Sequence, residues 1–405
     1  MPRVLLTEGE QRATLAVARS LGRAGLDISV TSATGRSIAG ASRYVDQDIQ
    51  VPHVGSEPAR HLSKVSKIVS SHAIDVLVPM TDASASVLLS LRESHTELTI
   101  PLPPSDTWMA ATDKASLVEL AGSLGIPVPG QIVVHDPDDT AWKTWASTRY
   151  PVIVKPHRSV IFDGTSLLGG PVGIAYDEAS GVERLHQLPR ACFPVLVQER
   201  IVGPGQGAFF LSDDGRTTAS FAHERIREKP PTGGVSVLRR AVPIQEDIRE
   251  YSERLLDELG WSGVAMVEFK RDEKTGTPYL MEINGRFWGS LQLAIDAGVD
   301  FPRLLLAQTG LAQLGPEQAD ENDGATRLGI QTRWLLGDLD HLIWMLKAPA
   351  WKRDEYALGS RASALLRFLL PQHHGTRLEV LKTDDARPFV REAIQWGQAL
   401  VGRDR

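Results

Sequence analysis

Residues 263–284, GVAMVEFKRDEKTGTPYLMEIN, decide the fold, because they read as a β-hairpin that carries an acid on each strand. The two apolar runs are strand-like, and the polar stretch between them, around Thr275, has the composition of a turn. A regular hairpin centred near Thr275 would place Glu268 opposite Glu282. Strand side chains alternate with a period of two, so both acids would lie on one face of the hairpin.

Two carboxylates that face each other across a ladder repel, so we expect a positive group between them. Asn284 lies two residues beyond Glu282 and adds a neutral oxygen on the same face. Two carboxylates and a carboxamide oxygen suit a hard cation, Mg²⁺ or Mn²⁺ in its place, which commonly also holds substrate phosphates. The alternative is a solvated acidic patch, neutralised by Lys270, Arg271 or Arg286.

Arg286 favours the metal-site interpretation. It follows Asn284 by two residues, on the same alternating face, and its neighbours Phe287 and Trp288 are apolar. A cation beside a metal site fits the handling of a phosphate or an acyl phosphate, where negative charge develops in the transition state.

Length and composition set the outer limits. A chain of 405 residues is long enough for two or three domains with substantial cores. The net charge of −6 argues against a nucleic-acid surface, and the single cysteine, Cys192, excludes an internal disulfide and a cysteine zinc site. No run of 18 apolar residues and no signal-peptide pattern occurs, so we expect a soluble, cytoplasmic protein without membrane association.

The first 112 residues alternate strand and helix signals, which predicts an open α/β domain with a parallel sheet. Ligands of such sheets bind beyond the carboxyl ends of the strands, which here are residues 7–10 and 79–82. The G-x-G-x-x-G fingerprint of dinucleotide-binding domains is absent. A proline-rich connection at 101–106 marks the approach to the next domain.

Two lysines of the middle region are candidates for phosphate contacts. Lys114 follows Asp113, a predicted helix cap, and lies in the first helical turn, where a bound phosphate would offset its unfavourable position. The alternative, which this residue alone favours, is an exposed lysine without a function. Lys155 ends the apolar strand PVIVKP, and the loop after it contains enough glycine for a phosphate-covering lid. Residues 223–242 are predicted to supply a second flexible loop with a dense run of cations. These cations suggest an anionic acyl donor, and the alternative is that they only keep the loop soluble.

Taken in order, these segments resemble the ATP-grasp superfamily, and NGRFWGSLQLAIDAGVDFP resembles its bacterial carboxylate–amine ligases. The resemblance covers residues 1–310. It implies an α/β fold with an N-terminal parallel-sheet (pre-ATP-grasp) domain at 1–112 and an α+β ATP-grasp domain at 113–310, whose lid subdomain spans about 113–190. A mainly helical C-terminal extension at 311–405 would follow, and its paired histidines, His373 and His374, have little support as metal ligands.

The resemblance also implies the roles of individual residues. Lys114 and Lys155 would bind the phosphates of ATP. The adenine would lie against Gln198, Glu199 and the backbone of Ile201. The metal ligands would be Glu268, Glu282 and Asn284, with both acids also serving the nucleotide. The catalytic cations, Arg286 and Arg239, would steady the transferred phosphoryl group.

The implied reaction joins a small-molecule carboxylate to an amine, such as an amino acid or a peptide, in two steps. ATP first phosphorylates the carboxylate, and the amine then displaces phosphate to form an amide. Two alternatives stay open: an enzyme like biotin carboxylase or carbamoyl-phosphate synthetase, and an ATP-binding protein without turnover. The expected partners are small molecules, not nucleic acid or membranes, and the chain could form a homodimer.

Overall fold

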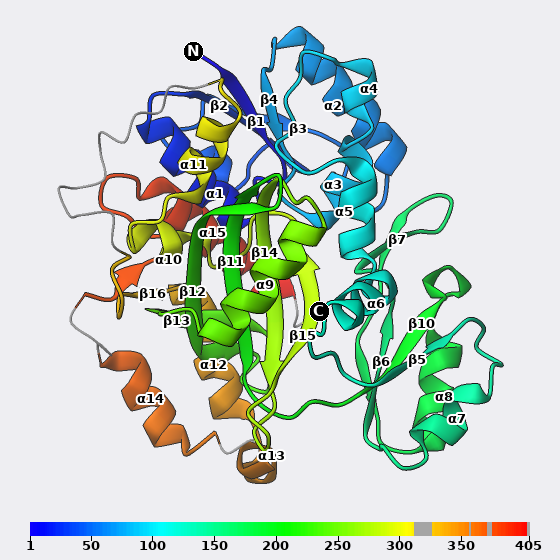
Figure 1. The fold of residues 1–405 in the computed structure, drawn as a ribbon. Coiled ribbons are helices and arrows are strands. Elements are labelled where there is room, and N and C mark those ends of the chain that lie inside the picture. The colour runs from blue at the N-terminus through cyan, green and yellow to red at the C-terminus, as the bar shows by residue number, and fades with distance from the viewer. Residues whose placement is uncertain (312–325, 356–357, 371–374, 403–405) are drawn as a thin grey trace.

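The computed structural model describes residues 1–311, 326–355, 358–370 and 375–402, which form an N-terminal α/β domain, a lid and a large antiparallel sheet (Figure 1). The lid stands to one side of the large sheet, and the N-terminal domain covers one end of it. This arrangement confirms the predicted fold class of a parallel-sheet domain followed by an α+β domain.

The N-terminal domain contains a parallel sheet in the order β3-β2-β1-β4. Its strands are β1 (Arg3–Leu6), β2 (Asp27–Ser32), β3 (Gln47–Gln50) and β4 (Val76–Val78), and its α-helices are α1 (Arg12–Arg23), α2 (Pro58–Ser71), α3 (Asp82–Leu88), α4 (Leu91–Ser94) and α5 (Ser105–Thr112). The sequence did not indicate β3, because QDIQ has no apolar run. It becomes a strand by pairing with β2 at the edge of the sheet.

The lid is an antiparallel sheet in the order β5-β10-β6-β9. Its strands are β5 (Gln131–Val134), β6 (Val152–Pro156), β9 (Gly173–Ala175) and β10 (Val195–Glu199), and α7 (Ala141–Ala146) and α8 (Glu178–Gln187) accompany them. Helix α6 (Lys114–Ser123) leads into it. The predicted glycine-bearing loop after Lys155 is a small hairpin of β7 (Val160–Phe162) and β8 (Leu167–Gly169).

The large sheet has seven strands in the order β15-β14-β11-β12-β13-β16-β17. Its first five are β11 (Gly205–Asp213), β12 (Arg216–Lys229), β13 (Val235–Val242), β14 (Gly263–Arg271) and β15 (Pro278–Asn284), with α9 (Glu246–Glu258), α10 (Leu291–Asp296) and α11 (Phe301–Gln308) packed around them. The prediction of a flexible loop at 223–242 is wrong for most of that range, since residues 235–242 form β13. Residues 223–229 continue β12, because they pair with β13.

Two apolar clusters join the N-terminal domain to the large sheet, and the second contains Leu5 of β1 and Phe210 of β11. Buried residues of α1, such as Leu15, belong to the same cluster as Phe209 of β11 and Trp288, whose rings stack with centroids 4.3 Å apart. The lid has a separate core around Trp142. The lid therefore has fewer apolar ties to the rest of the molecule than the other two parts have to each other.

The C-terminal region is mainly helical, as the sequence predicts, and it also completes the large sheet. Strand β16 (Gln331–Arg333) pairs antiparallel with β13, and β17 (Arg377–Leu378) pairs parallel with β16. The helices are α12 (Leu335–Lys347), α13 (Ala350–Glu355), α14 (Arg361–Leu369) and α15 (Arg387–Gly402). His373 and His374 lie outside the described residues.

Buried ion pairs fasten this region to the N-terminal domain. Arg19 Nε of α1 lies 2.9 Å from Asp385 Oδ2, and each side chain is 1% exposed. Arg12 Nη1, also on α1, lies 2.6 Å from Glu379 Oε2. The segment around residues 379–385 is thus part of the folded body and not an appendage.

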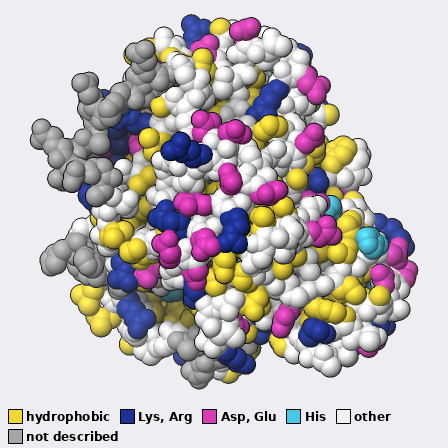
Figure 2. Space-filling view, in the orientation of Figure 1, with side chains coloured by type: hydrophobic (Ala, Val, Ile, Leu, Met, Phe, Trp, Pro, Cys, Tyr) yellow, Lys and Arg dark blue, Asp and Glu magenta, His cyan; other side chains and the backbone are white. Residues whose placement is uncertain are grey.

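No helix in the described ranges combines the length and the apolar character needed to cross a bilayer. On the face shown in Figure 2, acidic and basic side chains are interspersed, most densely over α9, and do not gather into one basic patch. Arg249 and Arg254 of α9 pair with Glu253 and Glu250 on the same helix. This face offers no electrostatic footprint for nucleic acid.

Candidate active site

The hairpin acids face each other as the sequence predicts, but a bulge is needed to bring them there. Near the turn the ladder pairs Arg271 with Pro278 and Phe269 with Leu280, a register that would set Glu268 opposite Met281. The register shifts between Glu268 and Phe269, so that Glu268 pairs with Glu282. An extra residue on one strand re-aims the side chains beyond it, as bulges beside active sites commonly do.

The surroundings of the two acids shift their pKa values in opposite directions. Burial raises the pKa of Glu268, and the charge of Glu282 adds to this effect, while Arg225 opposes it. Burial also disfavours ionised Glu282, but Lys114, the Asn284 amide and Lys155 outweigh that effect and lower its pKa. The side chains are 27% and 28% exposed, so solvent still reaches them. Glu268 pairs with Arg225, a cation of the large sheet, whereas Glu282 pairs with Lys114, a cation of α6.

Asn284 and Arg286 connect the hairpin to the N-terminal domain. Asn284 Nδ2 donates to Glu282 Oε1 at 3.2 Å, and Arg286 Nη2 donates to Asn284 Oδ1 at 3.0 Å. Arg286 also pairs with Asp82 Oδ2 at 3.2 Å. Asp82 is the first residue of α3, just beyond the carboxyl end of β4, so one of the two predicted ligand-binding ends of the parallel sheet reaches the hairpin.

Lys114 and Lys155 are both 6% exposed and lie close to the acids. Lys114 Nζ is 3.3 Å from Glu282 Oε2 and donates to Ser159 Oγ at 2.9 Å. Burial lowers the pKa of Lys155 to about 8, and the charge of Lys114 adds to this effect, while Glu282 opposes it. Two buried lysines beside one carboxylate leave an excess of positive charge, which an anionic ligand would neutralise.

The start of α6 holds Lys114 in place. Asp113 is confirmed as the cap of this helix, since its Oδ1 accepts from the backbone N–H groups of Ala115 and Ser116. Its other oxygen accepts from the His157 ring at 2.7 Å and from Arg158 Nε at 3.2 Å. These bonds, with His157 first, outweigh burial and lower the pKa of Asp113. One carboxylate thus ties the helix that carries Lys114 to the lid.

Gln198, Glu199 and Ile201, which we expected to contact the adenine, lie where the lid ends and the connection to the large sheet begins. Gln198 is buried and donates to Gln131 Oε1 at 2.9 Å, whereas Glu199 is exposed at the end of β10. The Ile201 carbonyl accepts from Lys270 Nζ at 3.2 Å. Gly203 has a φ of +150°, and a Cβ there would lie 1.9 Å from the Arg271 carbonyl oxygen, so only glycine lets this hinge approach the hairpin so closely.

Arg239 differs from its expected place beside the phosphoryl group. It is 1% exposed, pairs with Glu379 of the C-terminal region and donates to the Ser236 carbonyl at 3.0 Å. The arginine that contacts a hairpin acid is Arg225, whose Nη2 lies 3.1 Å from Glu268 Oε1. These two arginines are paired across β12 and β13, and β12 lies one strand nearer to the hairpin in the sheet, an order that no local pattern reveals.

The donor set fits a hard divalent cation. Glu268 and Glu282 oppose each other, Asn284 supplies a carboxamide oxygen beside them, and Lys114 and Arg225 contact the two acids from different elements. Within the described residues no group of three or more His, Cys, Asp or Glu side chains could hold a metal. The hairpin therefore offers a two-acid, one-amide site, the kind that Mg²⁺ completes with water and substrate phosphates.

A cavity opens beside Glu282 and Asn284, and α3, α5, the start of α6 and residues 158–160 of the lid line its remaining walls. Asp113, Arg225 and Ser159 were not predicted as site residues, whereas Asp82 was a candidate for a substrate contact. Asp82 lies in a segment that the strand pattern marked as a ligand-binding end, whereas Arg225 was noticed only as part of a cationic run. Lid, hairpin and N-terminal domain thus meet at one chamber, which is lined by the cations Lys114 and Arg158 and by the side-chain oxygens of Asp82, Glu282 and Asn284.

Residues 194–335 match the family "ATP-grasp in the biosynthetic pathway with Ter operon". The matched segment begins at the last strand of the lid and includes the hairpin, Arg286 and the start of the C-terminal region. No curated protein matches the sequence.

Solved structures with a similar fold cover most of the chain. The L-amino acid ligase of Bacillus licheniformis has a TM-score of 0.60 at 17% identity, over 81% of this chain and 78% of the ligase. The biotin carboxylase of Campylobacter jejuni in an ATP complex has 0.61 at 15%, over 75% and 70%. The carboxyaminoimidazole ribonucleotide synthase of Aspergillus clavatus complexed with ATP has 0.57 at 17%, over 74% and 75%. At these identities the likeness concerns the fold.

Proposed function

The chain carries an ATP-grasp domain, and on that premise we propose that it is an ATP-dependent carboxylate–amine ligase that forms an amide through an acyl phosphate. The observation that carries the proposal is the pairing of Glu268 with Glu282, flanked by Lys114 and by Asn284 with Arg286. This arrangement supports binding of a metal–nucleotide complex with a cation next to the transferred group.

The proposal gives each of the expected site residues a role. Gln198, Glu199 and Ile201 hold the adenine, and Lys114 and Lys155 neutralise the phosphates. Glu268, Glu282 and Asn284 would hold Mg²⁺, which supplies charge neutralisation at the phosphates when bound. Arg286, tied to Asp82 at 3.2 Å, is positioned to steady the transferred phosphoryl group. Arg239 could join it only by exchanging its buried partner Glu379.

In the first step an oxygen of the substrate carboxylate attacks the γ-phosphorus, the bond to the bridging oxygen breaks, and ADP leaves. In the second step the deprotonated amine attacks the acyl carbon, the bond from that carbon to the phosphate oxygen breaks, and the amide nitrogen loses its remaining extra proton. Neither step needs a protein nucleophile. This agrees with a single cysteine that is buried in the lid, where burial raises the pKa of its thiol.

Replacing Glu282 tests the assignment. Glu282→Gln keeps the shape but removes the charge that opposes Glu268, so kcat for ADP release should fall by about a hundredfold or more. The matched control is Glu273→Gln, in the turn of the same hairpin, where activity should be unchanged. An intact unfolding transition in both variants excludes misfolding as the cause. Wild-type turnover by Glu282→Gln would contradict the proposed metal site.

Isotope transfer tests the reaction class. Pooled amino acids and short peptides are first screened for phosphate release, and the active acid is then supplied with ¹⁸O in its carboxylate. One label should appear in the released phosphate, because the attacking oxygen leaves with phosphorus. Release of AMP and pyrophosphate would instead show adenylation. Turnover with bicarbonate but with no other acid would favour the carboxylase-like alternative, whose fold this chain shares.

A further inference from the structure

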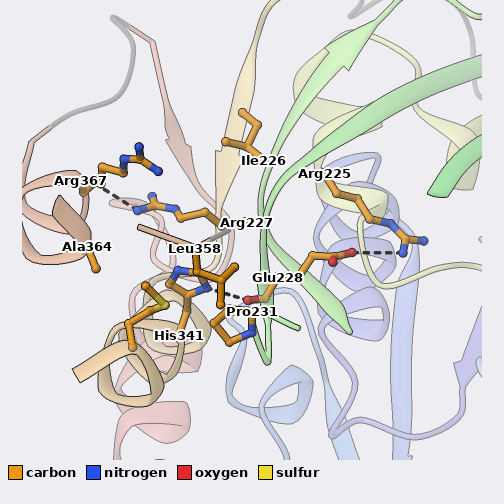
Figure 3. A pocket seen from close by; sticks show the side chains of 10 residues that line it. Arg225, Ile226, Arg227, Glu228, Pro231, His341, Leu358, Ala364 and Arg367 are labelled. Carbon is orange, nitrogen blue, oxygen red and sulfur yellow. Dashed lines mark hydrogen bonds and ion pairs between the residues drawn. The ribbon is translucent and has the colours of Figure 1, made fainter. Parts of the chain in front are cut away.

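A second cavity, of about 210 Å³, lies between β12 and the C-terminal helices (Figure 3). Arg225, Arg227 and Glu228 of β12 line it on one side, and His341 of α12 and Arg367 of α14 line it on the other. Pockets that enclose a whole drug-sized ligand commonly measure about 300–1,000 Å³. This cavity can therefore hold one end of a substrate but not a nucleotide.

The cavity is joined to the candidate active site through Arg225. That guanidinium lies 3.1 Å from Glu268 and 3.4 Å from Glu228. The ladder between β12 and β13 shifts register on both sides of Arg227, and four successive residues, 225–228, all line the cavity. In Figure 3 Arg225 points toward Glu228, while Arg227 reaches the other way, toward α14. A molecule in the cavity would lie with one end near the hairpin acids.

Arg227 gives the far end of the cavity its charge. Its side chain is 9% exposed, its Nη1 donates to the Arg367 carbonyl at 3.1 Å, and its Nη2 lies 3.0 Å from Asp338 Oδ2. Asp338 also pairs with Arg333 at 2.6 Å, so one carboxylate serves two guanidinium groups. Arg227 Nε has no hydrogen-bond partner among the described residues. An arginine buried with a shared counter-ion and an unused donor is suited to bind an anion.

The rest of the lining is apolar and includes Ile226, Pro231, Met345 and Leu358. The cavity thus has cations toward both ends and an apolar wall between them. We propose that it is the specificity pocket for an acyl donor that carries a second anionic group, a carboxylate or a phosphate, at the end remote from the reacting carboxylate. This proposal adds a substrate class to the proposed ligase function. It rests on that function only for the carboxylate that reacts. Arg227 and Arg367 recognise the remote anion.

Matched acids test the pocket in the full-length protein. Glutarate and 4-phosphonobutyrate carry a second anion, whereas pentanoate has a similar chain without one. Calorimetry measures binding of each, and ADP release with MgATP measures turnover. A charge-assisted contact predicts that the wild type binds the dianions about tenfold to a hundredfold more tightly than pentanoate. Equal affinity for all three acids would overturn the proposal.

Two variants and a control test whether the preference for dianions depends on residues of this cavity. Arg227→Met removes the charge but keeps an apolar stem, and Ala364→Glu adds a competing carboxylate from α14. Each should remove the preference for dianions and leave the KM for ATP unchanged. Arg216→Met, at the exposed start of the same strand, should retain the preference. Retention of the preference by both pocket variants would refute the site.

The outcomes separate this pocket from the ligase reaction. Preferential binding of dianions without ADP release would leave the pocket supported and the ligase function refuted. Release of ADP with monoanionic acids alone would support the ligase and refute the pocket.

Discussion

At the scale of single residues, Lys155 is 6% exposed at the end of a lid strand, and its Nζ forms no hydrogen bond within the described part of the chain. Burial lowers its pKa to about 8, so keeping it charged costs the protein free energy. A bound phosphate would repay that cost, because it supplies the missing counter-charge. The lysine is therefore expected to contribute to nucleotide binding more than to the stability of the free protein.

Lys155→Ala should weaken binding of ATP by about 1.5–3 kcal/mol, the strength of a charge-assisted contact. Calorimetric titration with a non-hydrolysable ATP analogue measures the effect directly. Lys143→Ala is the control, since that lysine lies in the same lid but pairs with Glu178 at the surface. Unchanged nucleotide affinity in Lys155→Ala would count against the phosphate contact.

Glu392 of α15 is expected to make stability depend on pH. Burial raises its pKa from 4.5 to about 7, although Trp334 donates to one oxygen at 2.7 Å. The folded state therefore holds a proton between pH 4.5 and 7 that the unfolded state has lost. Stability from this group is present below pH 4.5 and is lost as pH rises to 7.

Glu392→Gln should remove this loss of stability at higher pH, because glutamine does not ionise. Its side-chain oxygen can still accept the hydrogen bond from Trp334. Urea unfolding should show the variant equal to the wild type at pH 4.5 and more stable at pH 8, by at most about 3 kcal/mol. Glu258→Gln, exposed on α9, should have no such pH-dependent effect. A difference between variant and wild type that is the same at both pH values would exclude ionisation as its cause.

At the scale of elements, the N-terminus of α6 joins stability to function. Asp113→Ala removes an N-cap, which should cost about 1 kcal/mol in urea unfolding, and it also frees His157 and Arg158 of the lid. The KM for ATP should rise, because Lys114 is the first residue of that helix. Ser360→Ala removes the cap of α14 and should cost similar stability with no change in this KM. Equal KM values for ATP in Asp113→Ala and Ser360→Ala would show that Asp113 has no effect on nucleotide binding.

Local patterns predicted most elements but not every strand. Apolar runs and turn residues identified β1, β2, β4, β6, β10 and the β14–β15 hairpin, because these signals lie within a few residues of each other. Strands β16 and β17 span three and two residues and exist through pairing with distant partners, which no window of sequence contains. The bulge opposite Glu268 is invisible for a related reason. The symmetry about Thr275 predicted the pairing of the acids, but not the irregular ladder that produces it.

The same limit applies to the candidate site. The spacing of Glu268, Glu282, Asn284 and Arg286 along one hairpin could be read directly, and the structure brings them together. Arg225 and Arg239 are opposed on neighbouring strands, and only their distant partners distinguish them, which are Glu268 for Arg225 and Glu379 for Arg239. The contribution of Asp82 depends on how the N-terminal domain packs on the hairpin, which is a property of the tertiary fold.

At the scale of the whole molecule, the C-terminal region contributes buried charges that the N-terminal domain needs. Asp385 accepts from Arg19 at 2.9 Å, from Ser42 Oγ at 2.6 Å and from the Arg43 backbone at 3.0 Å. Its neighbour Asp384 pairs with Arg23 instead, with side chains 44% and 40% exposed. Two adjacent aspartates therefore contact the same helix, one in the interior and one at the surface.

Asp385→Ala should destabilise the protein by about 3–5 kcal/mol, because it leaves Arg19 charged and buried. Asp384→Ala should cost less than about 1 kcal/mol, since solvent screens that pair. Urea unfolding of both variants under one set of conditions measures the contrast. Similar losses in the two variants would show that the buried pair contributes no more than the surface one.

The pair of Arg19 with Asp385 has a consequence for how the protein is made. The two residues are 366 positions apart, so a ribosome adding about 5–20 residues per second needs roughly 20–70 seconds to deliver the aspartate after the arginine. Throughout that interval Arg19 of α1, which is buried in the finished fold, has no Asp385 with which to pair. The nascent N-terminal domain therefore cannot complete this buried ion pair until the C-terminal segment has emerged.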